Sequence, residues 1–188
     1  MSILAIAANA ATLSDRQQTS REERWCKPEP RQVKLNVDAS FHYDSSAGST
    51  GAILRDYQGN FVAAETTYLP HVASPMMAEA YAMRQGLILA NRLGCNNVAA
   101  ESDSLEIIQA CTGEHSWWSE AAAIFADCMD LILQIGNVKF RFCLREANKV
   151  SHELAKNSFM NRNSCIWEAE APNFIVSSLV NDVTIMDA

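Results

Sequence analysis

The sequence predicts a single α/β domain of five strands and four helices in the order βββαβααβα. Three observations predict it: short segments that alternate apolar and polar residues, longer segments with apolar residues at helical spacing, and turn or capping residues between them. The 188 residues are 48% hydrophobic, which is enough for one packed core. We expect residues 1–30 to be a polar tail or linker, residues 31–162 the domain, and residues 163–188 a C-terminal extension.

The first three strands are expected to form an antiparallel meander. From Val33 to Phe41 apolar and polar residues alternate, which places the polar set, Asp38 included, on one face. A polar loop leads to a second strand near residues 49–56. A short turn containing Gly59 follows, and residues 61–69 make the third strand.

The remaining elements are predicted with the help of the residues that start or stop them. Ser74 and Pro75 are the N-cap and first residue of a helix that continues to Leu93, where Gly94 ends it. Asn148 is expected to cap the last helix. The other predicted elements are a strand at 97–101, helices at 104–111 and 117–134, a strand with a basic outer face at 138–144, and the last helix at 149–160.

Three acidic residues lie where folding alone does not explain a carboxylate. Asp38 projects from the middle of the first strand, and Asp103 follows the fourth strand, where sites are commonly built. Glu79 shares a helix face with small and apolar residues, where an unpartnered carboxylate would be costly. Together these residues predict a metal site, although Asp38 taken alone is compatible with a solvated strand residue. Glu101 is interpreted either as a satellite acid of that site or, preferably, as a surface charge.

Composition excludes several classes of protein. No apolar run is long enough to span a bilayer, and residues 3–11 lack the basic flank of a secretory signal. The six cysteines have no C-x-x-C spacing and are interpreted as reduced core residues. The net charge of −7 disfavours non-specific binding of nucleic acid, so any such binding must be local.

Several motifs in order resemble type-one ribonuclease H, especially the plant branch found in retroelement reverse transcriptases. The resemblance spans roughly residues 25–182. The motifs are VKLNVD at 33–38, GAILRD at 51–56, AEA at 78–80, ESDS at 101–104, REANKV at 145–150 and ELAK at 153–156.

The resemblance implies a ribonuclease H-like, five-stranded mixed sheet flanked by helices, in which three antiparallel strands are followed by two parallel additions. It implies an endonuclease that hydrolyses the RNA strand of RNA–DNA hybrids with two Mg²⁺ ions, or Mn²⁺ in their place. Asp38, Glu79 and Asp103 match the metal ligands. His152 stands where the family has its fourth catalytic acid, and imidazole is a poorer ligand for Mg²⁺ than carboxylate.

A second group of residues is expected to bind the hybrid. The chain is expected to be a monomer and to contact no membrane. The predicted contacts are Ala39, Ser40, Asn148, Arg145 and Lys149. The basic segment around 139–156 either follows a phosphate backbone or is a solvated face. Two functions remain open: a hybrid-cutting enzyme slowed by His152, or a catalytically weak retroelement remnant that serves as a nucleic-acid or protein interaction module.

Overall fold

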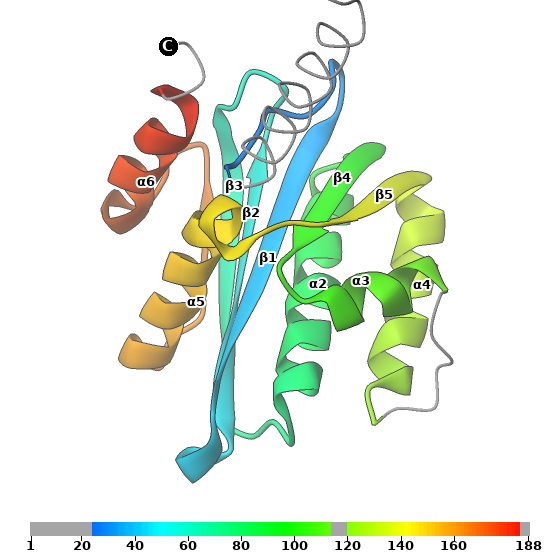
Figure 1. The fold of residues 1–188 in the computed structure, drawn as a ribbon, viewed down its shortest axis with the longest axis vertical. Helices are drawn as coiled ribbons and strands as arrows, with labels where there is room; N and C mark the ends of the chain where they lie inside the picture. Colours follow the sequence, from blue (N-terminus) through cyan, green and yellow to red (C-terminus); the bar gives the residue numbers. More distant parts are fainter. Residues whose placement is uncertain (1–23, 114–119, 185–188) are drawn as a thin grey trace, which may run out of the picture.

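A six-stranded mixed sheet forms the centre of the molecule in the computed structural model, which describes residues 24–113 and 120–184. The strands lie side by side in the order β5-β4-β1-β2-β3-β6, and all of them except β6 are labelled in Figure 1. Their bounds are β1 Val33–His42, β2 Ala47–Arg55, β3 Phe61–Leu69, β4 Asn97–Ser102, β5 Asn137–Phe142 and β6 Cys165–Glu168. The predicted α/β class and meander are confirmed.

Strand β1 lies at the centre of the sheet and links its two halves. It pairs antiparallel with β2 on one side and parallel with β4 on the other, and β5 then adds parallel to β4. The sequence prediction lacked β6, which pairs antiparallel with β3 within the segment expected to be an extension. Its four residues are too few to show a clear alternation of polar and apolar side chains. Only the edge of β3, with which these residues pair, identifies them as a strand.

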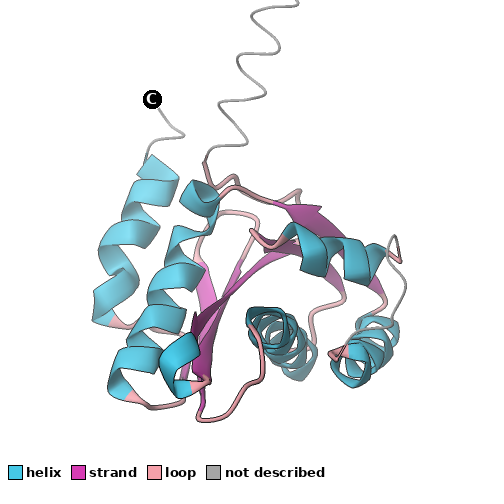
Figure 2. Cartoon of the chain, turned by 60° about the horizontal axis from the view of Figure 1, so that its bottom comes forward, coloured by secondary structure: helices cyan, strands magenta, loops and turns pink. Residues whose placement is uncertain are grey.

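Helices cover the two faces of the sheet in separate groups, as Figure 2 shows. The helices α2, α3 and α4 lie on one face, and α5 and α6 lie together on the other. Their bounds are α2 Pro75–Arg92, α3 Leu105–Thr112, α4 Ala122–Ile135, α5 Lys149–Asn161 and α6 Asn173–Thr184, with short 3-10 turns η1 Tyr43–Ser45 and η2 Arg145–Asn148. Residues 117–119, where the third predicted helix was expected to begin, lie outside the described residues.

The caps predicted for the first helix are confirmed. The Ser74 hydroxyl accepts a hydrogen bond from the Met77 main-chain N–H, and Pro75 is the first helical residue. Gly94 follows the helix with φ +69, a left-handed conformation that favours glycine. These local signals fix where α2 starts, and so where Glu79 is placed relative to the sheet.

The core has one larger and one smaller part. The larger lies between the sheet and α2, α3 and α4, and the smaller between the sheet and α5 and α6. The six cysteines all lie in the described residues and form no disulfide, and Cys111, Cys128 and Cys143 are buried, consistent with reduced core residues. In the described part of the chain, no helix combines the length and apolarity that crossing a membrane requires.

Trp25 shows that the segment before β1 is attached to the domain. Its side chain is only 1% exposed, and its indole N–H donates to Asn36 Oδ1 at 2.9 Å. Residues 1–23 of the expected tail lie outside the described part of the chain. The packed segment therefore begins at least at Trp25, some residues earlier than the predicted domain start.

Helix α5 packs unusually close to the sheet at Gly51, so Gly51→Ala is expected to destabilise the fold. An added Cβ would lie 2.3 Å from the Ser151 carbonyl oxygen and 2.5 Å from the Ala155 main-chain N. Both are backbone atoms, so α5 must move, at a cost of about 1–3 kcal/mol. Chemical denaturation measures this cost. A free energy of unfolding within about 0.5 kcal/mol of wild type, the range of neutral surface substitutions, would show that α5 is not held this tightly.

Candidate active site

The three predicted acids come from three elements that meet beside β1. Asn36 on β1 is paired with Glu101 on β4, so continuing this parallel register by two residues brings Asp38 level with Asp103. Helix α2 packs on β1 and presents Glu79 from its second turn. Asp38 is buried, with 4% exposure, whereas Glu79 and Asp103 are partly exposed. The acids therefore border solvent on one side only.

The electrostatics of the three carboxylates show that they act on one another. Burial raises the pKa of Glu79 well above its usual range, and the charges of Asp38 and Asp103 raise it further. Burial also raises the pKa of Asp38, and Asp103 adds to the rise, while the hydrogen bond from His152 opposes it. The Ala39 main-chain N–H donates toward both carboxylates. The fold thus brings Asp38, Glu79 and Asp103 close enough for their charges to interact.

The donor set suits a divalent cation with hard oxygen ligands. Glu79 Oε2 is buried and has no hydrogen-bond partner among the described residues. A cation that binds carboxylate oxygen would satisfy that atom and relieve the repulsion that raises the pKa of Glu79. In residues 24–113 and 120–184, however, no three His, Cys, Asp or Glu side chains already converge as ligands, so these acids must adjust their rotamers to share an ion.

His152 occupies a place directly beside the acids. Its Nδ1 lies 2.8 Å from Asp38 Oδ2, and its side chain is 31% exposed. Arg145 Nη2 lies 3.4 Å from each ring nitrogen. His152 therefore contacts the central carboxylate, and Arg145 lies next to its ring; its role as a metal ligand stays a prediction.

Asn148 is at the N-cap position of α5 as predicted, but its side chain does not cap the helix. Its Nδ2 donates to the Val37 carbonyl and to Asp103 Oδ1, both at 2.8 Å, and Ser151 Oγ donates to its Oδ1 at 2.6 Å. The residue is 1% exposed. In this arrangement Asn148 positions the Asp103 carboxylate. The contact of Asn148 with a hybrid stays a prediction.

The other predicted nucleic-acid contacts surround the acids at different depths. Arg145 is exposed, and Lys149, 57% exposed, lies 3.9 Å from Glu153. Ser40 lines a cavity next to His152.

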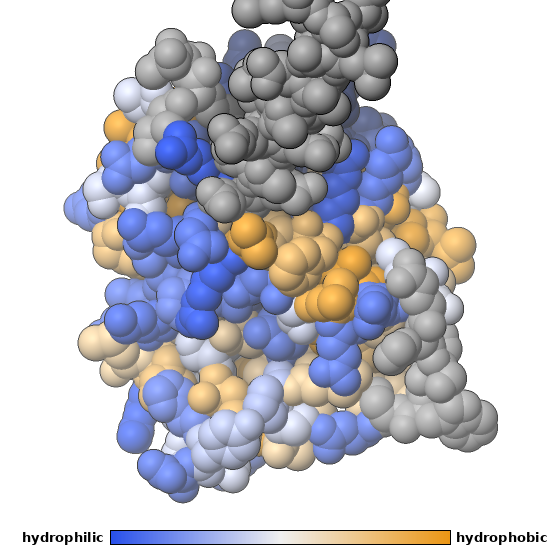
Figure 3. All heavy atoms as spheres, viewed as in Figure 1, coloured by the Kyte–Doolittle hydropathy of each residue, from blue (hydrophilic) through white to orange (hydrophobic). Residues whose placement is uncertain are grey.

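Figure 3 shows that hydrophilic side chains extend over α5 on the face of the molecule seen there, while apolar side chains gather toward the end of β5. The exposed apolar residues there include Leu105, Phe142 and Leu144.

The preferred interpretation of Glu101 as a surface charge is wrong. Glu101 is 6% exposed and forms a 2.5 Å ion pair with Lys34, and Asn36 Nδ2 donates to its other oxygen at 3.1 Å. The alternation of polar and apolar residues does not reveal the burial of Glu101, because the polar face of β1 is itself covered by α5, α6 and the segment around Trp25.

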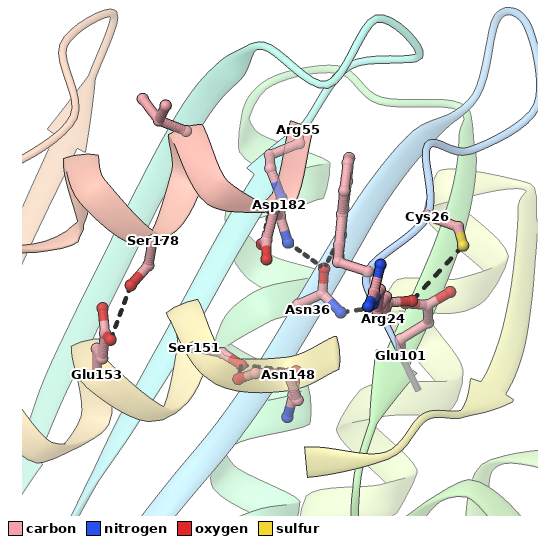
Figure 4. A network of polar contacts seen from close by, with 12 residues as sticks. Arg24, Cys26, Asn36, Arg55, Glu101, Asn148, Ser151, Glu153, Ser178 and Asp182 are labelled. Atoms are coloured by element: carbon pink, nitrogen blue, oxygen red, sulfur yellow. Dashed lines mark hydrogen bonds and ion pairs between the residues drawn. The ribbon is translucent and has the colours of Figure 1, made fainter. Parts of the chain in front are cut away.

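Sequence reasoning also missed the network to which Glu101 belongs, drawn in Figure 4. Arg55, 1% exposed, pairs with Asp182 of α6 at 2.7 Å, donates to Asn36 at 3.0 Å and stacks 3.7 Å from the centre of the Trp25 ring. Burial lowers the pKa of Arg55 to about 10. Asn36 is two residues from Asp38 on the same strand face, so this network fixes the strand on which the central acid stands.

Comparison with known proteins identifies the class to which this fold and site belong. The model of the reverse transcriptase-like family matches residues 36–158, and the chain belongs to that family, which has a ribonuclease H-like domain. The matched range contains Asp38, Glu79, Asp103 and His152. No curated protein sequence matches the chain.

Several solved ribonuclease H structures share the fold of this chain. The N-terminal RNase H domain of a Mycobacterium tuberculosis protein has a TM-score of 0.65 at 17% identity, covering 69% of this chain and 94% of that one. RNase H1 of Halobacterium salinarum has a TM-score of 0.64 at 18% identity, covering 70% and 99%. A compost-derived RNase H1 in complex with RNA/DNA hybrid has a TM-score of 0.63 at 18% identity, covering 69% and 97%. At these identities the likeness shows the fold, which is that of type-one ribonuclease H.

The raised pKa of Glu79 predicts a stability that depends on pH. A carboxyl group whose folded-state pKa is raised favours folding at low pH, and this contribution is lost as pH rises through the folded-state pKa. Glu79→Gln removes the ionisation, so in EDTA its melting temperature is expected to exceed that of wild type by more at pH 8 than at pH 5. The gain should be about 1 kcal/mol, the scale of one stabilising substitution.

Thermal melts of both proteins at the two pH values measure this difference. Glu106→Gln is the matched control, because Glu106 is an exposed glutamate on α3. An equal gap at both pH values would mean that Glu79 ionises normally.

Proposed function

We propose that this chain is a divalent-metal-dependent endonuclease that hydrolyses the RNA strand of RNA–DNA hybrids. The observation that carries the proposal is the meeting of Asp38, Glu79 and Asp103 from β1, α2 and the end of β4 within a ribonuclease H-like fold. Mutually repelling carboxylates with an unpartnered buried oxygen are expected where a cation completes the site. The hybrid-bound structural relative supports the choice of substrate.

Asp38, Glu79 and Asp103 would hold Mg²⁺ or Mn²⁺. When bound, such ions activate a water and stabilise the charge that develops on a phosphodiester. Asn148 keeps Asp103 oriented through the 2.8 Å hydrogen bond. Arg145, exposed beside these acids, would bind a substrate phosphate.

The proposal is tested with an end-labelled RNA–DNA hybrid and purified full chain in Mg²⁺ and in Mn²⁺. RNA–RNA and DNA–DNA duplexes of the same sequence serve as substrates that should stay intact. We expect internal cuts in the RNA strand of the hybrid alone, lost in Asp103→Asn. Cuts that survive Asp103→Asn would show that cleavage does not come from the candidate active site, and intact RNA in both metals would refute the enzyme.

His152 favours a second function, an interaction module with little or no turnover. Its 2.8 Å contact with Asp38 occupies one oxygen of the central carboxylate, which then has fewer free positions for ions. In this case the folded chain binds a hybrid but leaves it intact in either metal. The same assay, with a binding measurement beside it, distinguishes the two functions.

A further inference from the structure

A cavity of about 470 Å³ adjoins the candidate active site and differs from it in charge. It lies between the end of β1 and the C-terminal half of α5, and its wall includes His152. The other lining residues are Ser40, His42, Lys156, Phe159, Met160 and Arg162. None of the lining residues is acidic, although the chain carries a net charge of −7 and three carboxylates lie on the other side of His152.

The two permanent cations of the cavity have no ion-pair partner among the described residues. Lys156 and Arg162 are both exposed, and no acid of the described chain lies within ion-pair distance of either side chain. Lys149, by contrast, is on the α5 face that carries Glu153. Cations left unpaired beside a concave surface attract an anionic ligand.

The walls of the cavity are held in place by contacts that do not depend on a ligand. His42 and Phe159 stack with ring centroids 3.6 Å apart and planes 9° apart, which joins the end of β1 to α5. Ser49 Oγ donates to the Ala155 carbonyl at 2.6 Å, joining α5 to β2. Arg162 stands at φ +48, and Ser158 Oγ donates to the Asn163 carbonyl beyond it, so the turn that carries the guanidinium is itself bonded.

We propose that this cavity binds a backbone phosphate of the nucleic-acid substrate, away from the bond that is cut. Lys156 and Arg162 supply the charge, and the Ser40 hydroxyl is the neutral donor. Lys156 and Arg162 follow His152 by four and ten residues, about 6 and 15 Å along a helix at 1.5 Å per residue. At 3.4 Å per phosphate along one strand, the bound phosphate is roughly two to four nucleotides from the reaction centre. This inference rests on the proposed function, since it assumes a nucleic acid at the acids.

The test is the salt dependence of hybrid binding, measured in EDTA so that binding is read without cleavage. Lys156→Gln/Arg162→Asn removes two charges, and Asn suits the left-handed backbone at position 162. Lys27→Gln/Arg31→Asn is the matched control: it removes the same two charges, both residues are exposed, and Arg31 also has a positive φ of 65. Both lie before β1, at the opposite end from the cavity.

Each phosphate contact contributes about 0.9 to the slope of log affinity against log salt, so loss of this one contact in the cavity variant should lower the slope by about 0.9, and the control should not lower it. Equal slopes for both variants and wild type, or equal losses in the two variants, would overturn the inference and leave the proposed function standing. Wild-type protein that binds no hybrid at any salt concentration would overturn both. Matched melting temperatures of the two variants establish that the comparison is between folded proteins.

Discussion

Asp38→Asn is expected to abolish cleavage of an RNA–DNA hybrid, by at least about a thousandfold, equivalent to about 4 kcal/mol in the activation barrier. Asp38 is the most buried of the three acids and lies between Glu79, Asp103 and His152. An amide has a similar shape but no negative charge, so it removes the central ligand for a cation with little change in packing. Rates of hybrid cleavage in Mg²⁺ measure the loss.

Stability separates this loss from unfolding. The charge of Asp38 raises the pKa of Glu79, so its removal relieves repulsion, and Asp38→Asn should melt at or above the wild-type temperature in EDTA. Asp130→Asn is the matched control, because Asp130 is an exposed aspartate on α4. Undiminished cleavage by Asp38→Asn would remove the candidate active site altogether, whereas a collapsed melting temperature would show that Asp38 is structural.

His152→Asp is expected to raise cleavage in Mg²⁺ by about tenfold, which is about 1.4 kcal/mol in the barrier. The substitution removes the imidazole that is bonded to Asp38 Oδ2 and places a hard oxygen ligand beside it. The same change adds a negative charge next to three others, so the metal-free protein should be less stable than wild type. Added Mg²⁺ should then raise its melting temperature by more than it raises that of wild type.

The His152→Asp substitution should lower stability in EDTA but increase the response of the melting temperature to Mg²⁺, and these opposite signs make the test specific. His152→Asn removes the imidazole without adding charge, so it should show neither the loss of stability in EDTA nor the larger response to Mg²⁺. Arg145 offsets part of the new charge, since its Nη2 lies 3.4 Å from the ring that Asp would replace. Cleavage and metal response that are unchanged in His152→Asp would show that this position is not a ligand position.

The order of strands and helices could be predicted from local patterns because those patterns are set by neighbours in the chain. The Ser74 cap with Pro75, and the alternation of β1, fixed the type and place of their elements. Strand β6 could not be found this way. Its pairing partner, β3, is about a hundred residues earlier, and four residues carry too little pattern.

The sequence by itself determined the α/β class, through the order of its local patterns, and the elements that carry Asp38, Glu79 and Asp103, because a carboxylate on a strand or helix face is visible in local periodicity. Only the tertiary structure decided what those acids and their neighbours contact. His152 reaches Asp38 across 114 residues, and Asn148 reaches Asp103 across 45. Glu101 is buried, and its partner Lys34 comes from another strand. Such contacts depend on how elements pack, which no spacing along the chain records.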